Sequence, residues 1–264
     1  MRFPRLVSFG VSLLLLSASL PAQQSPPPQR DPQAITVLSQ TVNAAGGLTA
    51  VSAIQDYTAT GTVTYLWAGQ PVQGTVTLRQ KGADEFRLDA NLQSGIRSWA
   101  VSYGAGSVKE TDGSAHPVGF ANALKLGALT FPLAEIYTDL QDSSTTLIYM
   151  GSTQIAGRTV QQIHAQRNFS PQSDPDGSLS KLRARDLFID SSNLQLILIR
   201  DILYPPQSFT ANYQHEISFS DYRTVNGLLV PFTISEKIAG QQTWIIQLSQ
   251  TSFNSGLSDS DFQI

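Results

Sequence analysis

The three histidines, His116, His164 and His215, are the first candidates for catalytic or metal chemistry in this chain. A hydrolytic triad needs a serine nucleophile beside a histidine, and the chain has no G-x-S-x-G motif to present one. No two histidines lie at a short metal-ligand spacing, and there is no H-E-x-x-H motif. His215 alternates in phase with Tyr213 and Ile217, which favours an interior or rim position over the role of a catalytic base. The sequence therefore predicts no catalytic residue, no metal and no cofactor.

Two pairs of closely spaced aspartates also lack the context that acid–base or cation chemistry needs. Asp174 and Asp176 lie in a D-P-D-G turn, and Asp259 and Asp261 lie in the C-terminal tail. A glycosidase needs two carboxylates that face each other, and a calcium loop needs further oxygen ligands at fixed spacing. Turns and chain ends are ordinary places for aspartate, so we assign these pairs no function.

The composition excludes several classes of protein. The 264 residues include no cysteine, which rules out disulfides, thiolate metal sites and a cysteine nucleophile. The formal net charge is −3 and no basic run occurs, so we expect no nucleic-acid partner. Hydrophobic residues make up 41% of the chain and charged residues only 14%, against about 25% in typical soluble proteins. This balance predicts a packed core rather than disorder.

The first 30 residues read as an export signal and a tether. Residues 1–22 place Arg2 and Arg5 before an apolar stretch that ends in small residues, which is the layout of a secretory signal peptide. An uncleaved membrane anchor is the alternative. Residues 23–30 form a proline-rich linker, and a single domain is expected over residues 31–264. With cleavage near Ala22, we expect the protein in the periplasm or outside the cell.

The elements that must position any site are short alternating strands with two helical segments. Residues 31–45 read as a capped helix, and helical periodicity returns at 119–141. Residues 169–180 read as a polar loop. The pattern predicts twelve strands at 57–67, 72–81, 84–92, 96–103, 106–111, 144–155, 158–168, 183–190, 194–203, 212–222, 230–238 and 243–252. Short connections favour antiparallel neighbours, and the lack of βαβ alternation predicts an α+β fold with helices on one face of the sheet.

Five segments carry a family signal through their order and spacing. They read AAGGLTAVSAIQDYTATGTV at 44–63, GTVTLRQKGADEFRLDA at 74–90, LFID at 187–190, SDYRTVNGLLVPFTI at 220–234 and FNSGLSDSDFQI at 253–264. This series resembles the LolA-like superfamily of outer-membrane lipoprotein-sorting proteins. The resemblance implies a strongly curved antiparallel half-barrel of about 11–12 strands, with an N-terminal helix and a central helical lid on the concave face, and a cavity for acyl chains. Arg87 matches the family's strand motif and is either a polar rim contact or a solvated strand residue.

On a curved sheet, more inward side chains face the interior than a few short helices can cover, and the excess would line a pocket for an apolar ligand. The alternative is that the same residues form an ordinary core. The expected lining from the strands is Tyr57, Val63, Tyr65, Trp67, Phe86, Leu88, Trp99, Val101, Tyr213, Ile217, Phe219, Trp244, Ile246 and Leu248. The lid would contribute Phe131, Leu133, Ile136 and Tyr137, and the polar rim Arg87 and His215.

These observations favour an exported, monomeric, non-enzymatic carrier or sensor that binds acyl chains of lipids or lipoproteins, with envelope membrane proteins as further partners. A rival hypothesis is an enzyme on the same fold, in which His164 or His215 and an acid such as Asp89 or Glu216 act inside the cavity. A third is a non-catalytic envelope module that binds a partner through the concave face.

Overall fold

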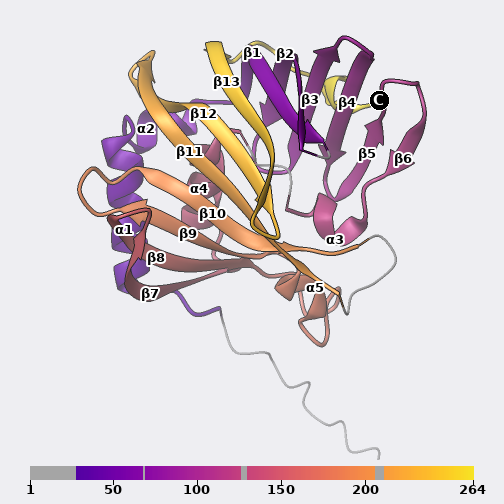
Figure 1. The fold of residues 1–264 in the computed structure, drawn as a ribbon. Coiled ribbons are helices and arrows are strands. Elements are labelled where there is room, and N and C mark those ends of the chain that lie inside the picture. Colours follow the sequence, from indigo (N-terminus) through magenta and orange to yellow (C-terminus); the bar gives the residue numbers. More distant parts are fainter. Residues whose placement is uncertain (1–27, 68, 126–129, 206–210) are drawn as a thin grey trace, which may run out of the picture.

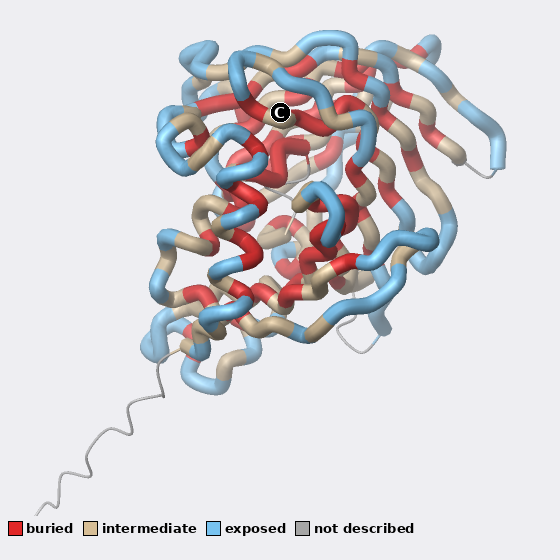
Figure 2. Tube along the Cα trace, turned by 90° about the vertical axis from the view of Figure 1, so that its left-hand side faces the viewer, coloured by how far each residue is buried: buried red, intermediate tan, exposed pale blue. Residues whose placement is uncertain are grey.

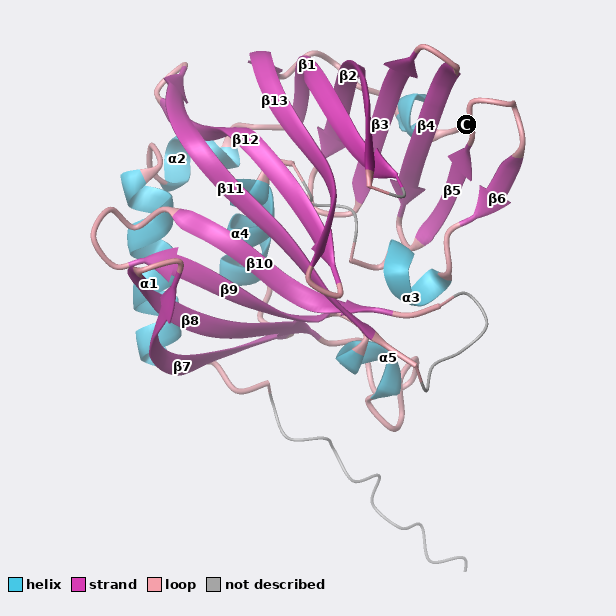
Figure 3. Ribbon diagram, viewed as in Figure 1, coloured by secondary structure: helices cyan, strands magenta, loops and turns pink. Residues whose placement is uncertain are grey.

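The fold is one antiparallel sheet that curves around a few helices (Figures 1 and 3). The computed structural model describes residues 28–67, 69–125, 130–205 and 211–264. The sheet has 13 strands in the order β6-β5-β4-β3-β2-β1-β13-β12-β11-β10-β9-β8-β7. The predicted α+β half-barrel is therefore confirmed. The predicted signal peptide and linker residues 23–27 lie outside the described residues.

The strand bounds follow the predicted ranges closely, with one strand added. The strands are β1 (Asp56–Trp67), β2 (Gln70–Lys81), β3 (Glu85–Leu92), β4 (Gly95–Ser102), β5 (Ala105–Lys109), β6 (Ala115–Pro117), β7 (Thr145–Ile155), β8 (Arg158–Arg167), β9 (Ala184–Asp190), β10 (Leu196–Leu203), β11 (Tyr213–Val225), β12 (Leu228–Ile238) and β13 (Gln241–Phe253). The helices are α1 (Pro32–Ala44), α2 (Leu48–Ser52), α3 (Phe120–Ala123), α4 (Pro132–Gln141) and α5 (Ser178–Lys181). The sequence pattern does not predict β6, because its three residues are all exposed and carry no alternation.

Strand β1 shows why the alternating pattern produces a sheet with two distinct faces. Tyr57, Val63 and Tyr65 are buried on the side where the helices pack, which we call the inner face, and the intervening threonines point to the outer face. Gly61 lies at a register shift between β1 and β13. A Cβ atom built there would come within 2.1 Å of the Gln247 carbonyl oxygen, so only glycine allows this close strand approach.

Helix α1 begins as the sequence predicts. The Asp31 side chain accepts a hydrogen bond from the backbone N–H of Gln33 at 2.8 Å, and Pro32 takes the first helical position. The helix buries Ala34, Val37 and Leu38 against the inner face. The buried residues of α1 belong to the same core as the buried residues of the strands, and Figure 2 shows both as buried segments that face each other.

A second, smaller apolar cluster lies on the outer face. It consists of Val160, Phe188, Ile197 and Leu198. The guanidinium of Arg200 covers the ring of Phe188 at 4.8 Å. Strand β10 therefore carries buried apolar residues on both faces of the sheet.

Helix α4, the central helix, is fixed at both ends and in its middle. Gln80 of β2 accepts a hydrogen bond from the backbone N–H of Phe131 at 3.0 Å, just before the helix begins. The ring of Phe131 stacks on Tyr57 at 5.0 Å between centroids. In the middle, buried Arg185 of β9 forms ion pairs with Glu135 and Asp139. These contacts hold α4 against the inner face as a packed part of the core.

Arg30 closes the C-terminal end of α4. Its Nη1 donates to the carbonyl oxygens of Asp139 at 3.1 Å, Asp142 at 2.7 Å and Thr145 at 3.0 Å, and its Nη2 donates to Leu140 at 2.9 Å. These carbonyls belong to the helix end and the turn after it, where backbone acceptors lack helical partners. Arg30 also forms a β-bridge with Leu147 of β7. The last residue of the predicted linker is thus docked on the fold.

Replacing Arg30 by alanine is expected to lower the free energy of unfolding by about 2 kcal/mol, because charge-assisted bonds to several carbonyls are lost. Urea denaturation followed by tryptophan fluorescence measures this loss. The matched control is Gln29→Ala. The backbone carbonyl of Gln29 accepts a hydrogen bond from the Leu147 N–H, which the substitution keeps, and the side chain that it removes is exposed. Equal midpoints for the two variants would show that Arg30 does not anchor α4.

No helix among the described residues is long and apolar enough to cross a membrane.

Candidate functional site

A cavity of about 380 Å³ opens on the inner face where α4 does not cover it. This volume falls within the usual range for small-ligand pockets. The lining comes from both halves of the sheet and from α3: Tyr65, Leu66, Arg97, Trp99, Val118, Asn122, Leu203, Glu236, Ile238, Thr243 and Trp244. A larger groove of about 900 Å³ lies elsewhere, against Gln29 and the loop at 168–181, and its lining combines serine and other polar residues with three prolines and Phe169.

Aromatic side chains provide the apolar wall of the cavity. Trp244 of β13 pairs in register with Tyr65 of β1, so the two lie side by side on the inner face. Trp99 of β4 stands edge-on to Phe86, with ring centroids 5.9 Å apart and an interplanar angle of 89°. These flat, rigid walls suit an apolar chain or ring.

The other predicted lining residues are distributed differently. Most are buried in the core against the helices: Tyr57, Val63, Phe86, Leu88, Val101, Phe131, Leu133, Ile136, Ile217, Phe219, Ile246 and Leu248. Tyr137 packs against this core and is partly buried. Tyr213 is 46% exposed at the start of β11. The side chain of Trp67 lies outside the described part of the structure.

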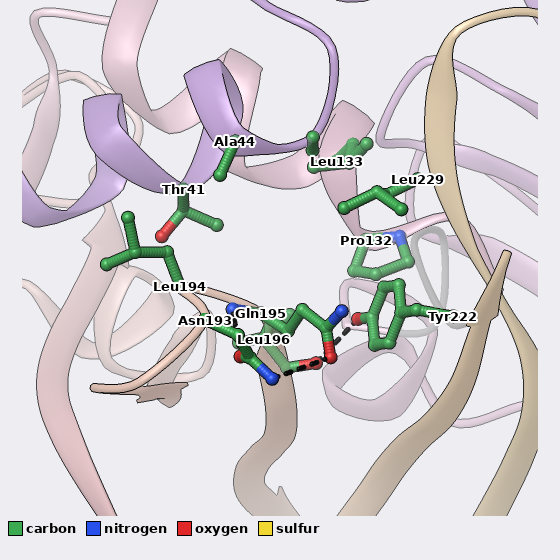
Figure 4. Close-up of a pocket in the computed structure, with 11 residues that line it drawn as sticks. Thr41, Ala44, Pro132, Leu133, Asn193, Leu194, Gln195, Leu196, Tyr222 and Leu229 are labelled. Carbon is green, nitrogen blue, oxygen red and sulfur yellow. Dashed lines mark hydrogen bonds between the residues drawn. The ribbon is translucent and has the colours of Figure 1, made fainter. Parts of the chain in front are cut away.

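The end of the inner face beneath α1 and α4 is closed. Only about 10 Å³ remains between these helices, the β9–β10 turn and Tyr222 of β11, which is close to the space of one water molecule (Figure 4). The Tyr222 hydroxyl donates to the Leu196 carbonyl across the base of this void. On the inner face, space for a ligand is therefore found at the α3 end.

A line of buried charges runs across the inner face to the cavity. His215 of β11 lies between Asp201 of β10, with Nδ1 and Oδ1 2.9 Å apart, and Glu236 of β12, with Nε2 and Oε1 3.1 Å apart. All three residues are buried. Burial alone would lower the pKa of His215, but the two carboxylates outweigh it and raise the pKa to about 10. His215 is therefore an imidazolium at neutral pH, and only Glu236 of the three lines the cavity.

Arg97 of β4 is the cation in the cavity wall, and it is held by a carboxylate. Its Nε donates to Glu110 Oε2 at 2.9 Å and its Nη2 donates to Glu110 Oε1 at 3.2 Å. The guanidinium also lies 5.5 Å from the centre of the Tyr65 ring. Burial raises the pKa of Tyr65, and Arg97 opposes that shift.

Helix α3 connects the two sides of the cavity. Asn122 bonds to both backbone groups of Tyr204, beyond the end of β10: its Nδ2 donates to the carbonyl oxygen at 2.8 Å, and its Oδ1 accepts from the N–H at 2.9 Å. Lys125 donates to the carbonyl oxygen of Ile202. On the other side, Phe120 and Leu124 pack close to Gly104 in the β4–β5 turn. Helix α3 thus links the turn after β4 to the end of β10.

Arg87 and the remaining histidines lie away from the cavity. Arg87 is on the outer face, where it bonds to Asp89 and to the carbonyl oxygens of Asp261 and Gln263 in the C-terminal tail. His164 contacts Asp186 at 2.9 Å, and His116 is exposed on β6.

The acids proposed as partners for a catalytic histidine also lie elsewhere. Asp89 binds Arg79 and Arg87, and Glu216 binds Arg200. The acids that contact His215 are instead Asp201 and Glu236. No group of three or more histidine, aspartate or glutamate residues in the described ranges is arranged to hold a metal ion.

No family model matches the chain, and no curated protein matches it. Solved structures do match over most of its length. A domain from Vibrio parahaemolyticus, described as an outer-membrane lipoprotein-sorting protein domain, aligns with a TM-score of 0.51 and 11% identity over 86% of this chain and 95% of the other. A LolA superfamily protein from Nitrosomonas europaea aligns with a TM-score of 0.51 and 9% identity over 87% of this chain and 97% of the other.

A DUF1329 family protein from Desulfovibrio piger aligns with a TM-score of 0.51 and 11% identity over 89% of this chain and 98% of the other. At such low identity the likeness concerns the fold alone. This chain has a LolA-like fold.

Proposed function

We propose that the protein is an exported carrier or sensor that takes an acyl chain of a lipid or lipoprotein into the cavity beside α3. The observation that carries this proposal is the aromatic cavity of about 380 Å³ between Tyr65, Trp99 and Trp244. The likeness in fold to a lipoprotein-sorting domain supports it, as does the signal-like N-terminal sequence. The chain would act as a monomer, with envelope membranes or membrane proteins as donor and acceptor.

Binding would come mainly from transfer of apolar groups out of water. Each buried methylene contributes about 0.8 kcal/mol, so affinity is expected to rise roughly fourfold per added methylene until the cavity is full. Because α4 is anchored by Gln80, Arg185 and Arg30, the ligand would enter beside α3 rather than beneath α4.

The geometry gives no support to a histidine base in this site. His215 is buried and both ring nitrogens face carboxylates. With its pKa raised to about 10, the imidazole carries a proton at neutral pH and has no free lone pair to accept another. The enzymatic alternative therefore gains no observation in its favour.

Replacing Val118 by tryptophan is expected to weaken binding of the apolar fluorophore N-phenyl-1-naphthylamine at least tenfold, because the larger ring fills space that the ligand needs. Val118 lines the cavity from the segment before α3. The measurement is a fluorescence titration of the purified mature protein, combined with mass spectrometry of lipids that co-purify with it.

Ile96→Trp is the matched control, since Ile96 lies on the outer face of β4 and is 57% exposed. It should bind the fluorophore as the unmodified protein does. If both variants bind the fluorophore as tightly as the unmodified protein does, the fluorophore binds outside this cavity. Absence of both binding and co-purified lipid would refute the proposed function.

A further inference from the structure

We propose that Glu236 selects the ligand: the cavity takes a single apolar chain that ends in an uncharged hydrogen-bond donor, such as a hydroxyl or amide N–H, and excludes a free carboxylate. This inference rests on the proposed function and names the class of ligand for the same cavity. It follows from which polar groups of the cavity wall are already bonded within the protein.

The imidazolium, guanidinium and amide donors near the cavity are engaged. His215 faces Asp201 and Glu236 with its two ring nitrogens. Arg97 donates two hydrogen bonds to Glu110. The Asn122 amide is held on both sides by the backbone of Tyr204.

Two further donors close to the cavity are also unsuited to a ligand carboxylate. The Lys125 ammonium donates to the Ile202 carbonyl oxygen and lies 5.2 Å from the centre of the Tyr204 ring. The Trp99 indole Nε1 is buried and has no hydrogen-bond partner among the described residues, but the indole is neutral and cannot offset the charge of a ligand carboxylate. Neither residue therefore supplies an open cation that would neutralise a ligand carboxylate in the cavity wall.

Glu236, in contrast, keeps acceptor capacity. Its Oε1 faces the ring of His215 and its Oε2 accepts from the Thr243 hydroxyl. A carboxylate has about four lone-pair sites, so about two remain for a ligand. The residue is 4% exposed and lines the cavity, which places this acceptor where bulk water competes weakly.

The charges lead to the same selection. A carboxylate on the ligand would meet Glu236 across a poorly hydrated space, and like charges repel strongly there. Arg97 cannot compensate for this repulsion because Glu110 already neutralises it. A ligand hydroxyl instead adds a hydrogen bond to a charged acceptor, which is among the stronger kinds of hydrogen bond.

The test is competition against N-phenyl-1-naphthylamine by three ligands with the same twelve-carbon chain: dodecan-1-ol, 1-methoxydodecane and dodecanoate, at pH 7.5 and 150 mM salt. The alcohol is expected to displace the probe at a concentration at least tenfold below that of the ether, which lacks the donor, and further below that of dodecanoate. In Glu236→Gln, the advantage of the alcohol over dodecanoate should fall at least tenfold, because the amide is neutral and also donates.

Glu216→Gln is the matched control, because Glu216 of β11 binds Arg200 away from the cavity. It should keep the order found for the unmodified protein. If the ether or dodecanoate displaces the probe as well as the alcohol does, the selection by Glu236 is overturned while the proposed function stands. If the probe itself does not bind, both fail. If Glu236→Gln does not fold, the ligand series on the unmodified protein still tests whether the cavity prefers the alcohol to the ether and to dodecanoate.

Discussion

Replacing Arg185 by methionine is expected to lower the free energy of unfolding by about 3–5 kcal/mol, since removal of one partner leaves buried charge without compensation. Arg185 is buried between β9 and α4, where it pairs with Glu135 and Asp139. Burial raises the pKa of both carboxyls, and Arg185 opposes that shift. Without the guanidinium, the two acids must take up protons or draw α4 away from the sheet. Urea denaturation at pH 7 measures the loss.

The control is Arg223→Met, because Arg223 pairs with Asp221 at 2.6 Å on the surface, where both side chains are about half exposed. Exposed pairs contribute little, so this variant should lose less than about 1 kcal/mol. A second variant removes the whole cluster, with Glu135→Gln and Asp139→Asn added to Arg185→Met. It should recover much of the lost stability, because neutral groups are easier to bury than unpaired charges. A small loss in Arg185→Met alone would show that α4 is not held by this cluster.

The sequence is sufficient to predict the strands and the first helix because their signals are local. Alternation from Tyr57 to Trp67 marks β1, and Asp31 with Pro32 marks the start of α1. The strand order across β1 and β13 depends on contacts between residues about 190 positions apart, and no local pattern contains them. The resemblance to a known family supplied the curved half-barrel but not this strand order.

The buried charges could not be placed from the sequence alone, because charged residues are ordinarily expected on the solvent side. A signal is present in their phase along the strands: Arg185 alternates with Leu187 and Ile189, and Glu236 alternates with Ile234 and Ile238. An ionised residue in phase with buried neighbours predicts a paired interior charge. The partners of those charges come from other strands and from α4, so only the structure identifies them.

The position of the cavity could not be predicted from the sequence either. Fourteen residues of the predicted strands and four of the predicted lid were equally good candidates for a cavity wall, and the placement of α4 decided between core and cavity. Tyr57 stacks against Phe131 and is covered, whereas Trp244 and Trp99 line the cavity, to which α4 contributes no residue. Sequence patterns give the face on which a residue lies, but which part of that face a short helix covers depends on its anchors.

Raising the pH from 6.5 to 10 is expected to remove roughly 5 kcal/mol of stability that depends on His215, at about 1.4 kcal/mol per pH unit. The histidine pKa lies near 6.5 in the unfolded chain and is raised to about 10 in the fold by Asp201 and Glu236, against the opposing effect of burial. A raised pKa means that the folded state holds the proton more tightly, so the contribution is complete below pH 6.5. It is lost as the pH rises through 10.

The comparison that isolates this effect is His215→Gln against the unmodified protein, with urea denaturation at intervals from pH 6 to pH 9.5. At pH 6 the variant should be several kcal/mol less stable, because Asp201 and Glu236 then face each other without a cation between them. The gap should narrow steadily above pH 6.5, because the unfolded chain then gives up the histidine proton while the folded, unmodified protein must still bind it to bridge the two carboxylates. His164→Gln is the control for loss of a histidine that contacts a single carboxylate, that of Asp186, and is partly exposed. Parallel stability profiles for His215→Gln and the unmodified protein would mean that His215 does not bridge the two carboxylates as an imidazolium, and Glu236 would then stand in the cavity wall without a buried counter-charge.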